Sequence, residues 1–274
     1  MTCWGPRCRT SLHRPPRRPQ AFTIDDASTR EIDDGLSVEA LPSGARRLWV
    51  HVADPSRWVA PGSPLDLEAR ARGTSLYLPT GTVPMFPWEL AAGPFSLVAG
   101  ASCAALSVGC ELRPDGSLDA ASVMVAPSTV VPTYRLTYEE ADELLDAAPR
   151  GGEPELAALY EAAEARRAWR EAQGAVAIEM PEVEYSVEGA DREDARVTLT
   201  SSPPVQPRSR TVVAELMILA GEAVASYGMA HGLALPYRGQ PQPTLPSEED
   251  LATLPPGPCR MVALRSCMTK VSGR

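Results

Sequence analysis

Residues 21–53 read AFTIDDASTREIDDGLSVEALPSGARRLWVHVA, and this stretch decides the fold class. It opens on a short apolar run at 21–24, which predicts a strand. Alternating apolar residues at 36–41 and 46–53 flank a Pro-Ser-Gly turn, so these two segments are predicted to pair as a β-hairpin. Strands therefore flank the intervening acidic segment, and the sheet is expected to hold that segment at its edge.

Outside this stretch, helical and strand patterns follow one another. Thr137 and Glu140 have the spacing of a helix capping box, and Gly174 ends the helical pattern of 153–173. The other predicted elements are helices at 65–72 and 209–231 and strands at 102–112, 118–125, 175–187 and 196–201, with loop-like sequence after residue 236. Because there is no regular β-α-β alternation, the sequence predicts an α+β fold.

The composition indicates a globular chain with an unusual start. The 274 residues are 44% apolar and 22% charged, which excludes a chain that is disordered throughout. Residues 1–20 hold five arginines and no acid, so the remaining chain carries a net charge of −14 against −9 for the whole. We therefore divide the chain into an Arg- and Pro-rich leader at 1–20 and a folded domain at 21–274. An Arg-rich composition without acids is also that of organelle transit peptides, although this segment is short and interrupted by prolines. A truncated or wrongly assigned start explains it equally well, so a chloroplast or mitochondrion is one expected location and the cytoplasm the other.

Charge, hydropathy and cysteine spacing exclude three classes of protein. An acidic body cannot coat nucleic acid through a diffuse basic field. A membrane span is not expected, because the most apolar stretch, 212–235, is interrupted by Glu215, Glu222 and His231. The six cysteines contain no C-x-x-C pair, so a structural zinc site is not expected either.

The segment between the first two predicted strands is dense in carboxylates. Five acids and one arginine give it a local charge of −4: Asp25, Asp26, Arg30, Glu31, Asp33 and Asp34. So many carboxylates ionise cheaply only if a cation lies among them or water screens them. Oxygen ligands suit Mg²⁺ or Mn²⁺, and Gly35 is predicted to kink the chain so that Asp33 and Asp34 converge. A solvated acidic loop fits the same residues, and both interpretations stay open.

The same residues carry a resemblance to a known family. AFTIDDASTREIDDGLSVE at 21–39 resembles the signature of the RNB catalytic domain of the ribonuclease II and ribonuclease R family. Four further blocks resemble the family in the expected order: WVHVADPSRWV at 49–59, SLYLPTGTVPMFPWEL at 75–90, AELMILAGEAVA at 214–225 and LPYRGQPQP at 235–243. The first and last blocks are most similar to the cyanobacterial and plant-organelle branch.

The resemblance implies an enzyme that hydrolyses single-stranded RNA from its 3′ end and releases nucleoside 5′-monophosphates with Mg²⁺ or Mn²⁺. The family's four acids fall on Asp25, Glu31, Asp33 and Asp34, which become the candidate catalytic residues. Asp25, Asp33 and Asp34 are the implied metal ligands, and Asp33 is implied to be essential to hydrolysis. Glu31 stands where the family usually has Asp, so its part in holding a second metal or a water is weaker.

Three further residues are implied to contact the RNA. Tyr77 matches a tyrosine that packs on the terminal nucleotide, Glu215 an acid that contacts the substrate sugar, and Arg238 an arginine able to meet a phosphate. Each also has an ordinary interpretation, as a buried strand tyrosine, a surface helix glutamate and a loop arginine. The expected partner is single-stranded RNA and not a membrane, and the protein is expected to be a monomer that can join RNA-degrading assemblies.

Parts of the family pattern are missing from the sequence. The block S-P-I-R-R-Y, whose arginines grip the reacting phosphate, does not occur before Arg274, and neither do the small OB-like RNA-binding domains that usually flank the catalytic domain. We therefore expect a carboxy-terminally truncated RNB domain with little or no activity alone. The alternative is a catalytically impaired remnant that binds RNA or a protein partner.

Overall fold

The computed structural model describes residues 19–148, 151–178, 180–181, 183–189, 192, 194–201 and 207–273. The predicted leader at 1–20, apart from residues 19 and 20, lies outside the described residues. Within the described part of the chain, helices and strands are mixed without a regular alternation, which confirms the α+β class.

A six-stranded sheet forms the centre of the fold, with the strand order β7-β6-β3-β2-β1-β8. Its strands are β1 (Ala21–Ile24), β2 (Asp34–Ala40), β3 (Arg46–Ala53), β6 (Cys103–Glu111), β7 (Met124–Val130) and β8 (Tyr134–Leu136). Neighbouring strands are antiparallel except β1 and β8, which pair in parallel although they are far apart in the sequence. The regular register of β2 on β3 confirms the predicted hairpin.

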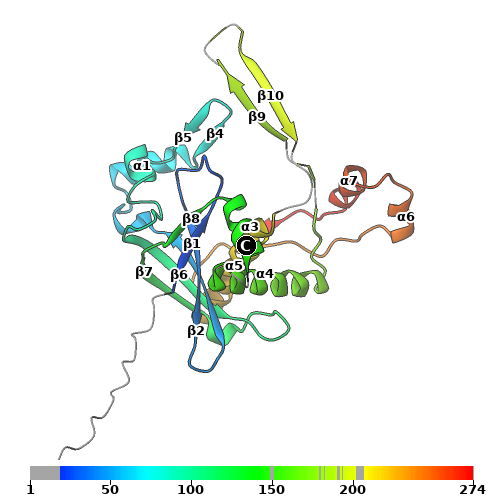
Figure 1. Cartoon of the computed structure of the whole chain (residues 1–274), viewed down its shortest axis with the longest axis horizontal. Helices are drawn as coiled ribbons and strands as arrows, with labels where there is room; N and C mark the ends of the chain where they lie inside the picture. Colours follow the sequence, from blue (N-terminus) through cyan, green and yellow to red (C-terminus); the bar gives the residue numbers. More distant parts are fainter. Residues whose placement is uncertain are drawn as a thin grey trace, which may run out of the picture.

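Three helices cover one face of this sheet (Figure 1): α3 (Tyr138–Ala147), α4 (Pro154–Ala172) and α5 (Arg208–His231). α3 begins at a capping box between Thr137 and Glu140, as the spacing predicted. α5 ends at Gly232, whose φ of 63° is the left-handed conformation that glycine adopts without steric cost. The helices predicted at 153–173 and 209–231 are therefore confirmed.

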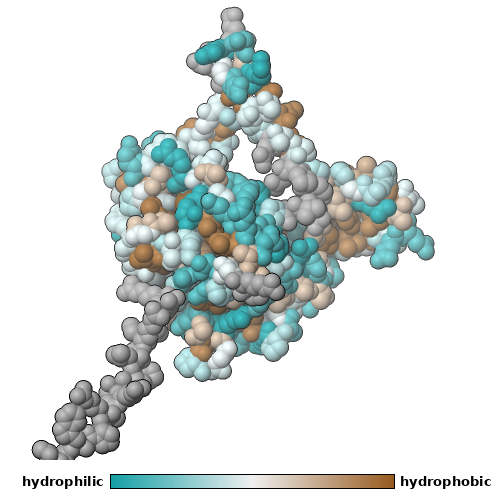
Figure 2. Space-filling model, in the orientation of Figure 1, coloured by the Kyte–Doolittle hydropathy of each residue, from teal (hydrophilic) through white to brown (hydrophobic). Residues whose placement is uncertain are grey.

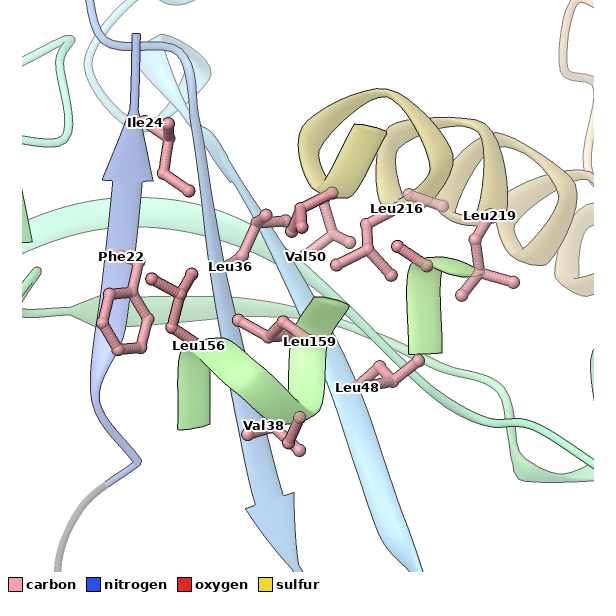
Figure 3. Packing of buried hydrophobic residues seen from close by; sticks show 14 of the residues in the cluster. Phe22, Ile24, Leu36, Val38, Leu48, Val50, Leu156, Leu159, Leu216 and Leu219 are labelled. Carbon is pink, nitrogen blue, oxygen red and sulfur yellow. The ribbon is translucent and has the colours of Figure 1, made fainter. Parts of the chain in front are cut away.

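The main hydrophobic core lies between these helices and the sheet (Figure 3). Apolar side chains at alternate positions of β1, β2 and β3 meet leucines of α4 and α5: Phe22, Ile24, Leu36, Val38, Leu48, Val50, Leu156, Leu159, Leu216 and Leu219. All of them are buried, and burying a side chain of this size stabilises a fold by about 1.5–3 kcal/mol. The core thereby fixes β1 and β2 on either side of the acidic segment.

The opposite face of the sheet carries smaller and more polar side chains. Ser37 and Ser107 hydrogen-bond the two ring nitrogens of His51, at 2.9 and 2.7 Å, which satisfies this buried imidazole. A second apolar cluster on this side joins small residues of the sheet to Leu97 and Ile32. Because Ile32 belongs to the acidic segment, that segment has its own anchor in the protein interior.

Among the described residues, α5 is the one helix long and apolar enough to cross a membrane by length and composition. Val212, Leu216 and Leu219 of this helix are fully buried in the core, whereas Ile218 and Met229 are exposed. Glu215 and Glu222 pair with arginines of α4. The core helix of a protein can meet the same test of length and composition.

Shorter elements fill the connections. α1 (Pro64–Arg72) confirms the predicted helix at 65–72, and β4 (Leu76–Leu78) pairs with β5 (Gly81–Val83) in an exposed hairpin. A second hairpin, β9 (Val183–Glu188) with β10 (Arg196–Ser201), projects from the body in Figure 1. The remaining elements are 3₁₀ turns at Pro55–Arg57 and Ala120–Ser122, α2 (Trp88–Ala91), β11 (Arg238–Gly239), α6 (Glu248–Ala252), α7 (Pro258–Ser266) and β12 (Ser272–Gly273).

Two predicted strands are displaced. The strand predicted at 118–125 begins later, as β7, because Asp119 accepts a hydrogen bond from the Ala121 N–H and starts a 3₁₀ turn. The strand predicted at 175–187 is confined to β9, and Pro181, which cannot donate to a strand ladder, lies just before it. Local hydrogen-bond chemistry therefore overrides the apolar pattern in both segments.

The loop predicted after residue 236 is also wrong, because α6 and α7 form there. Ser247 and Asp250 make a capping box at the start of α6. Pro258 occupies the first turn of α7, where its missing N–H is not needed. These start signals are present in the sequence, but the surrounding prolines and glutamines concealed them.

Candidate active site

The acidic segment, residues 25–33, joins β1 to β2 and is tied to the sheet at both ends. We call it the carboxylate loop. At its start, the Asp25 N–H donates to the Leu136 carbonyl at 3.1 Å, and at its end the Ala53 N–H donates to the Asp33 carbonyl at 2.8 Å. These bonds confirm that the sheet holds the loop at its edge.

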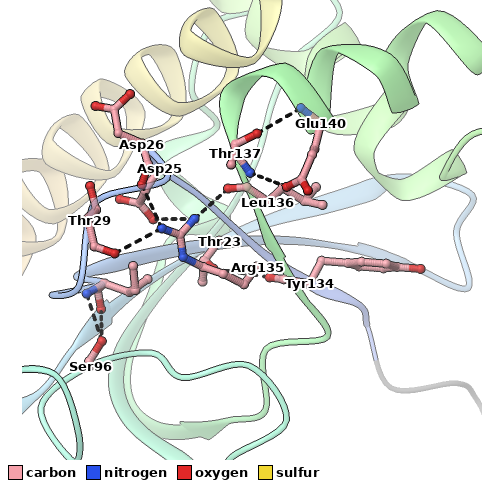
Figure 4. Close-up of polar contacts among 11 residues, drawn as sticks. Thr23, Asp25, Asp26, Thr29, Ser96, Tyr134, Arg135, Leu136, Thr137 and Glu140 are labelled. Carbon is pink, nitrogen blue, oxygen red and sulfur yellow. Dashed lines mark hydrogen bonds and ion pairs between the residues drawn. The ribbon is translucent and has the colours of Figure 1, made fainter.

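The middle of the carboxylate loop is held as well. The Ile32 N–H donates to Ser96 Oγ at 2.9 Å, and the Leu97 N–H donates to the Ile32 carbonyl at 2.9 Å. On the other side of the loop, the Arg135 guanidinium donates to backbone carbonyls (Figure 4). A loop with this many fixed backbone groups presents its side chains in a defined arrangement.

Gly35 does not kink the chain as predicted. It lies in the regular register of β2 on β3, and its φ is not in the left-handed region. A Cβ atom there would lie 3.3 Å from Leu97 Cδ1 and 3.4 Å from Thr23 Cγ2, so these side chains leave little space at Gly35. The prediction that a bend at Gly35 brings Asp33 and Asp34 together is therefore wrong.

Burial and mutual repulsion raise the pKa values of three carboxyl groups, those of Asp25 and Asp33 in the loop and that of Asp34 at the start of β2. Burial raises the pKa of Asp34 to about 6, and the charges of Asp25 and Asp33 add to this shift. Burial also raises the pKa of Asp25, where the Arg135 charge opposes the shift. The pKa of Asp33 is raised by burial and by the charge of Glu31. The negative charges are therefore close enough to interact, which makes the ionised loop costly.

The three implied metal ligands are not gathered around one point. In the part of the chain that the structure describes, no three His, Cys, Asp or Glu side chains form a group that could hold a metal ion. Asp34 is the first residue of β2, and strand alternation places it on the face of Leu36, toward the helices. The side chains would therefore have to rotate to share one ion.

One oxygen of the loop nevertheless fits a cation. Asp25 Oδ2 is buried and has no hydrogen-bond partner, and the nearest guanidinium nitrogen, Arg135 Nη1, lies 4.0 Å away. A buried carboxylate oxygen without a partner is unfavourable unless a cation or a donor reaches it. The donor set consists of oxygens alone, which suits Mg²⁺ or Mn²⁺ in chemistry. The metal site itself stays a prediction.

Tyr77 reaches the carboxylate loop from the β4–β5 hairpin. Its hydroxyl donates to Glu31 Oε2 at 3.2 Å, while the side chain is 66% exposed. The negative loop and burial raise the pKa of Tyr77 further above its usual range. The alternative of a buried strand tyrosine is therefore wrong, and an exposed ring stands beside the carboxylates.

Glu215 is neither a surface residue nor a member of the loop. It is 7% exposed in α5, and its Oε1 accepts a hydrogen bond from Arg170 Nη1 at 2.6 Å. Its second oxygen, Oε2, is buried without a partner. The ordinary interpretation as a surface helix glutamate was wrong, and Glu215 retains one free acceptor.

Arg238 lies apart from these residues in β11, which pairs with β12. Its side chain is exposed and lines a surface cavity of about 340 Å³ with residues 237–241 and 272. No residue of the carboxylate loop lines this cavity among those the structure describes. The structure therefore brings Asp25, Glu31, Asp33, Asp34 and Tyr77 together and leaves Arg238 at a separate place.

Sequence analysis missed two cations beside the candidate residues. Arg135 lies next to Asp25, as Figure 4 shows, and Arg170 pairs with Glu215. The parallel pairing of β1 with β8 brings Arg135 to the loop, and no local pattern specifies that pairing. Helix periodicity marks the faces of α4 and α5 but does not specify which arginine meets Glu215.

Comparison with known proteins assigns a family to this arrangement. The sequence profile of the RNB domain matches residues 15–266, which is most of the chain. The chain belongs to the RNB domain family. The match begins before residue 20, inside the segment predicted as a leader, so the RNB domain and that segment overlap in the sequence.

Two relatives confirm the resemblance to the cyanobacterial and plant-organelle branch. The RNB domain is 53% identical over 251 residues to an uncharacterised ribonuclease of Synechocystis. This match covers 92% of this chain and 36% of the relative. It is 43% identical over 249 residues to ribonuclease II, chloroplastic/mitochondrial, of Arabidopsis thaliana. This second match covers 91% of this chain and 30% of the relative. The chain thus spans about a third of the length of these proteins.

A solved structure confirms the fold of the RNB domain. RNase R of Mycoplasma genitalium, in complex with ribose-methylated single-stranded RNA, superposes with a TM-score of 0.76 at 20% sequence identity. The match covers 93% of this chain and 44% of that one. At this identity the similarity establishes the fold alone.

Proposed function

We propose that this RNB domain is the hydrolytic centre of a metal-dependent 3′→5′ exoribonuclease that releases nucleoside 5′-monophosphates from single-stranded RNA. The observation that carries the proposal is the carboxylate loop, whose backbone is fixed while its charges repel one another. The ribonuclease names of relatives that are 53% and 43% identical support the same activity. A fold gains nothing from concentrating ionised carboxylates at a sheet edge unless they serve a site.

Asp25, Asp33 and Asp34 would hold the metal ion, with Mg²⁺ preferred and Mn²⁺ accepted. The unpartnered Asp25 Oδ2 and the raised pKa of Asp34 both favour the arrival of a cation. When bound, such an ion supplies a hydroxide-like nucleophile at neutral pH and offsets the charge of the phosphate.

The other residues of the site would bind the RNA. The exposed Tyr77 ring offers a stacking surface for a terminal base, and Glu31 fixes its hydroxyl. Glu215 Oε2 is a free acceptor suited to a sugar hydroxyl, and the Arg170 ion pair orients its carboxylate. Arg238 would meet a phosphate farther along the strand, because it lies apart from the carboxylate loop.

The decisive experiment follows a labelled single-stranded RNA with the purified chain in excess, so that slow release is measured. We expect mononucleotides and a ladder that shortens from the 3′ end with Mg²⁺, and no release after chelation. Asp34→Asn should abolish this release. Asp146→Asn is the matched control, because Asp146 is 76% exposed and pairs with Arg208 outside the carboxylate loop.

Two results would contradict the proposal. Release that is equal in Asp34→Asn and wild type would show that the carboxylate loop is not the reaction centre. RNA binding without cleavage, unchanged by Mg²⁺ or chelator, would instead support the non-catalytic remnant. The organellar location of the Arabidopsis relative supports the same location here, and a fluorescent fusion of the full-length protein tests it.

A further inference from the structure

Arg135 lies where β8 runs beside β1, and the register of this parallel pair determines what it reaches. Arg135 pairs with Thr23, so the two side chains share one face of the sheet. Asp25 follows Thr23 by two residues, just beyond the end of β1, and its Oδ2 lies 4.0 Å from Arg135 Nη1. An arginine is long enough to pass Thr23 and enter the carboxylate loop, which a shorter side chain at this position could not do.

The guanidinium is bound mainly to backbone and only loosely to the nearby carboxylate. Nη2 donates to the carbonyls of Asp26 and Thr29, at 3.0 and 3.3 Å, and Nη1 donates to the Leu136 carbonyl at 2.8 Å. Asp25 Oδ2 lies 4.0 Å from Nη1, which is beyond hydrogen-bonding distance. Figure 4 shows this arrangement, with Arg135 between the loop and the end of β8.

We infer that Arg135 is the positioning residue of this site: it ties the carboxylate loop to β8 through two loop carbonyls and leaves Asp25 Oδ2 free for a cation. The inference rests on the proposed function for the identity of that cation. The planar guanidinium suits the task, because one rigid group can donate in several directions at once. A lysine has the charge but not this geometry.

Charge and position act on the metal in opposite directions, which makes the role testable. A positive charge close to a ligand oxygen repels a divalent cation, so removing the charge alone would tighten metal binding. Releasing the loop would weaken it, because ligands that are held by hydrogen bonds lose affinity when those bonds are removed. The sign of the change therefore separates a positioning residue from a mere charged neighbour.

The test compares Arg135→Gln and Arg135→Lys with Arg47→Gln in the purified chain. Arg47 is a matched control, because its side chain is 22% exposed against 26% for Arg135 and it also contacts one carboxylate, Glu111. Arg47 lies toward the hairpin turn, at the end of β3 opposite the carboxylate loop. Two properties are measured: hydrogen exchange of the amides of residues 25–33 without metal, and Mn²⁺ affinity by titration calorimetry, with Asp34→Asn defining the binding that belongs to the site.

We expect both Arg135 variants to speed exchange in the loop by about 10-fold or more, and the Arg47 variant to leave it unchanged. Both Arg135 variants should also weaken Mn²⁺ binding by about 10- to 100-fold. The inference is overturned if loop exchange matches that of the control, or if Gln tightens Mn²⁺ binding while Lys leaves it at the wild-type value. If the Arg135→Gln variant does not fold, the same two measurements on Arg135→Lys decide whether Arg135 positions the loop.

Failure of the proposed function gives a different result. If the wild-type chain binds no Mn²⁺ at the site, the metal-dependent activity is contradicted, and loop exchange alone then decides whether Arg135 positions the loop. If Mn²⁺ binds and loop exchange is unchanged in both variants, the inference fails while the proposed function stands.

Discussion

The carboxylate loop and the C-terminal arm, residues 244–273, differ in a way that hydropathy does not predict. The loop is densely charged, yet Ile32 is buried within it and backbone hydrogen bonds fix both of its ends. The arm contains apolar residues such as Val262 and Val271, yet neither α6 nor α7 buries a residue. Figure 2 shows hydrophobic surface on this arm.

The difference shows that position relative to the sheet, and not composition, determines which segment is held. The loop gains its anchors because it connects two core strands, and each anchor is a backbone group that needs a partner anyway. Near its C-terminal end, the arm contacts the segment that precedes it in the sequence, where Gln240 Nε2 donates to the Thr269 carbonyl at 2.7 Å. Segments with few buried contacts open most easily, so the arm is expected to open before the loop.

The largest expected effect comes from the strand that carries the loop. Phe22 is fully buried in β1, and its ring stacks on Tyr134 of β8 at 5.1 Å between centroids. Phe22→Ala leaves a cavity and should lower the free energy of unfolding by about 3–5 kcal/mol, measured by urea denaturation. A loss below about 1 kcal/mol would show that the loop is not supported by this core.

The second effect separates the charge of the loop from its anchoring. Asp34 has a pKa of about 6 in the folded state against 3.8 in the unfolded chain. The folded state therefore binds the proton more tightly, and stability falls as the pH rises from about 4 through about 6. Above this window the ionised carboxylate costs the fold at most about 3 kcal/mol.

Asp34→Asn removes this cost. In the absence of metal, the variant should be more stable than wild type at pH 8 and nearly equal to it at pH 4, by urea denaturation at both values. Saturating Mg²⁺ should then stabilise wild type and leave the variant unchanged. An equal stability difference between the variant and wild type at both pH values would show that the ionised Asp34 carboxylate does not destabilise the fold.

Much of the fold could be predicted because its signals are local. The hairpin of β2 and β3 follows from strict alternation around one turn, and the start of α3 follows from two residues, Thr137 and Glu140. The acidic cluster was equally visible, since its members lie within ten residues of each other. Its anchoring followed from the strands on both sides.

What could not be predicted depends on contacts between distant residues. Gly35 looks like a bend in the sequence, but it lies in a regular strand, with Leu97 and Thr23 packed closely against it. Arg135 reaches the loop only because β8 joins the edge of the sheet beside β1. For Glu215, the alternative to an RNA contact was a surface position on its helix, and the ion pair with Arg170 of another helix accounts for its buried position. Sequence periodicity identifies faces, but not which faces meet.

A third prediction tests whether the exposed ring of Tyr77, beside the carboxylate loop, contributes to RNA binding. Tyr77→Ala should weaken binding of a short single-stranded RNA by about 5- to 150-fold in Mg²⁺, because a base loses a stacking surface worth about 1–3 kcal/mol. Tyr185→Ala is the matched control, since Tyr185 is 55% exposed on the other protruding hairpin, β9–β10. Fluorescence anisotropy of a labelled oligonucleotide measures both. Equal losses in the two variants would mean that any exposed tyrosine contributes and that Tyr77 holds no special place.

The smallest effect tests the other side of the comparison. Val262 is 54% exposed in α7, so Val262→Ala removes little buried surface, and alanine has the higher helix propensity. The free energy of unfolding should change by no more than about 0.5 kcal/mol in either direction. The same substitution in β3, Val50→Ala, removes a side chain that is 3% exposed and should cost about 2–3 kcal/mol. Urea denaturation of the two variants side by side therefore measures how differently the arm and the central sheet, which carries the carboxylate loop, are held. A cost above about 1.5 kcal/mol for Val262→Ala would show that the arm packs against the body nearly as tightly as the strands of that sheet pack in the core.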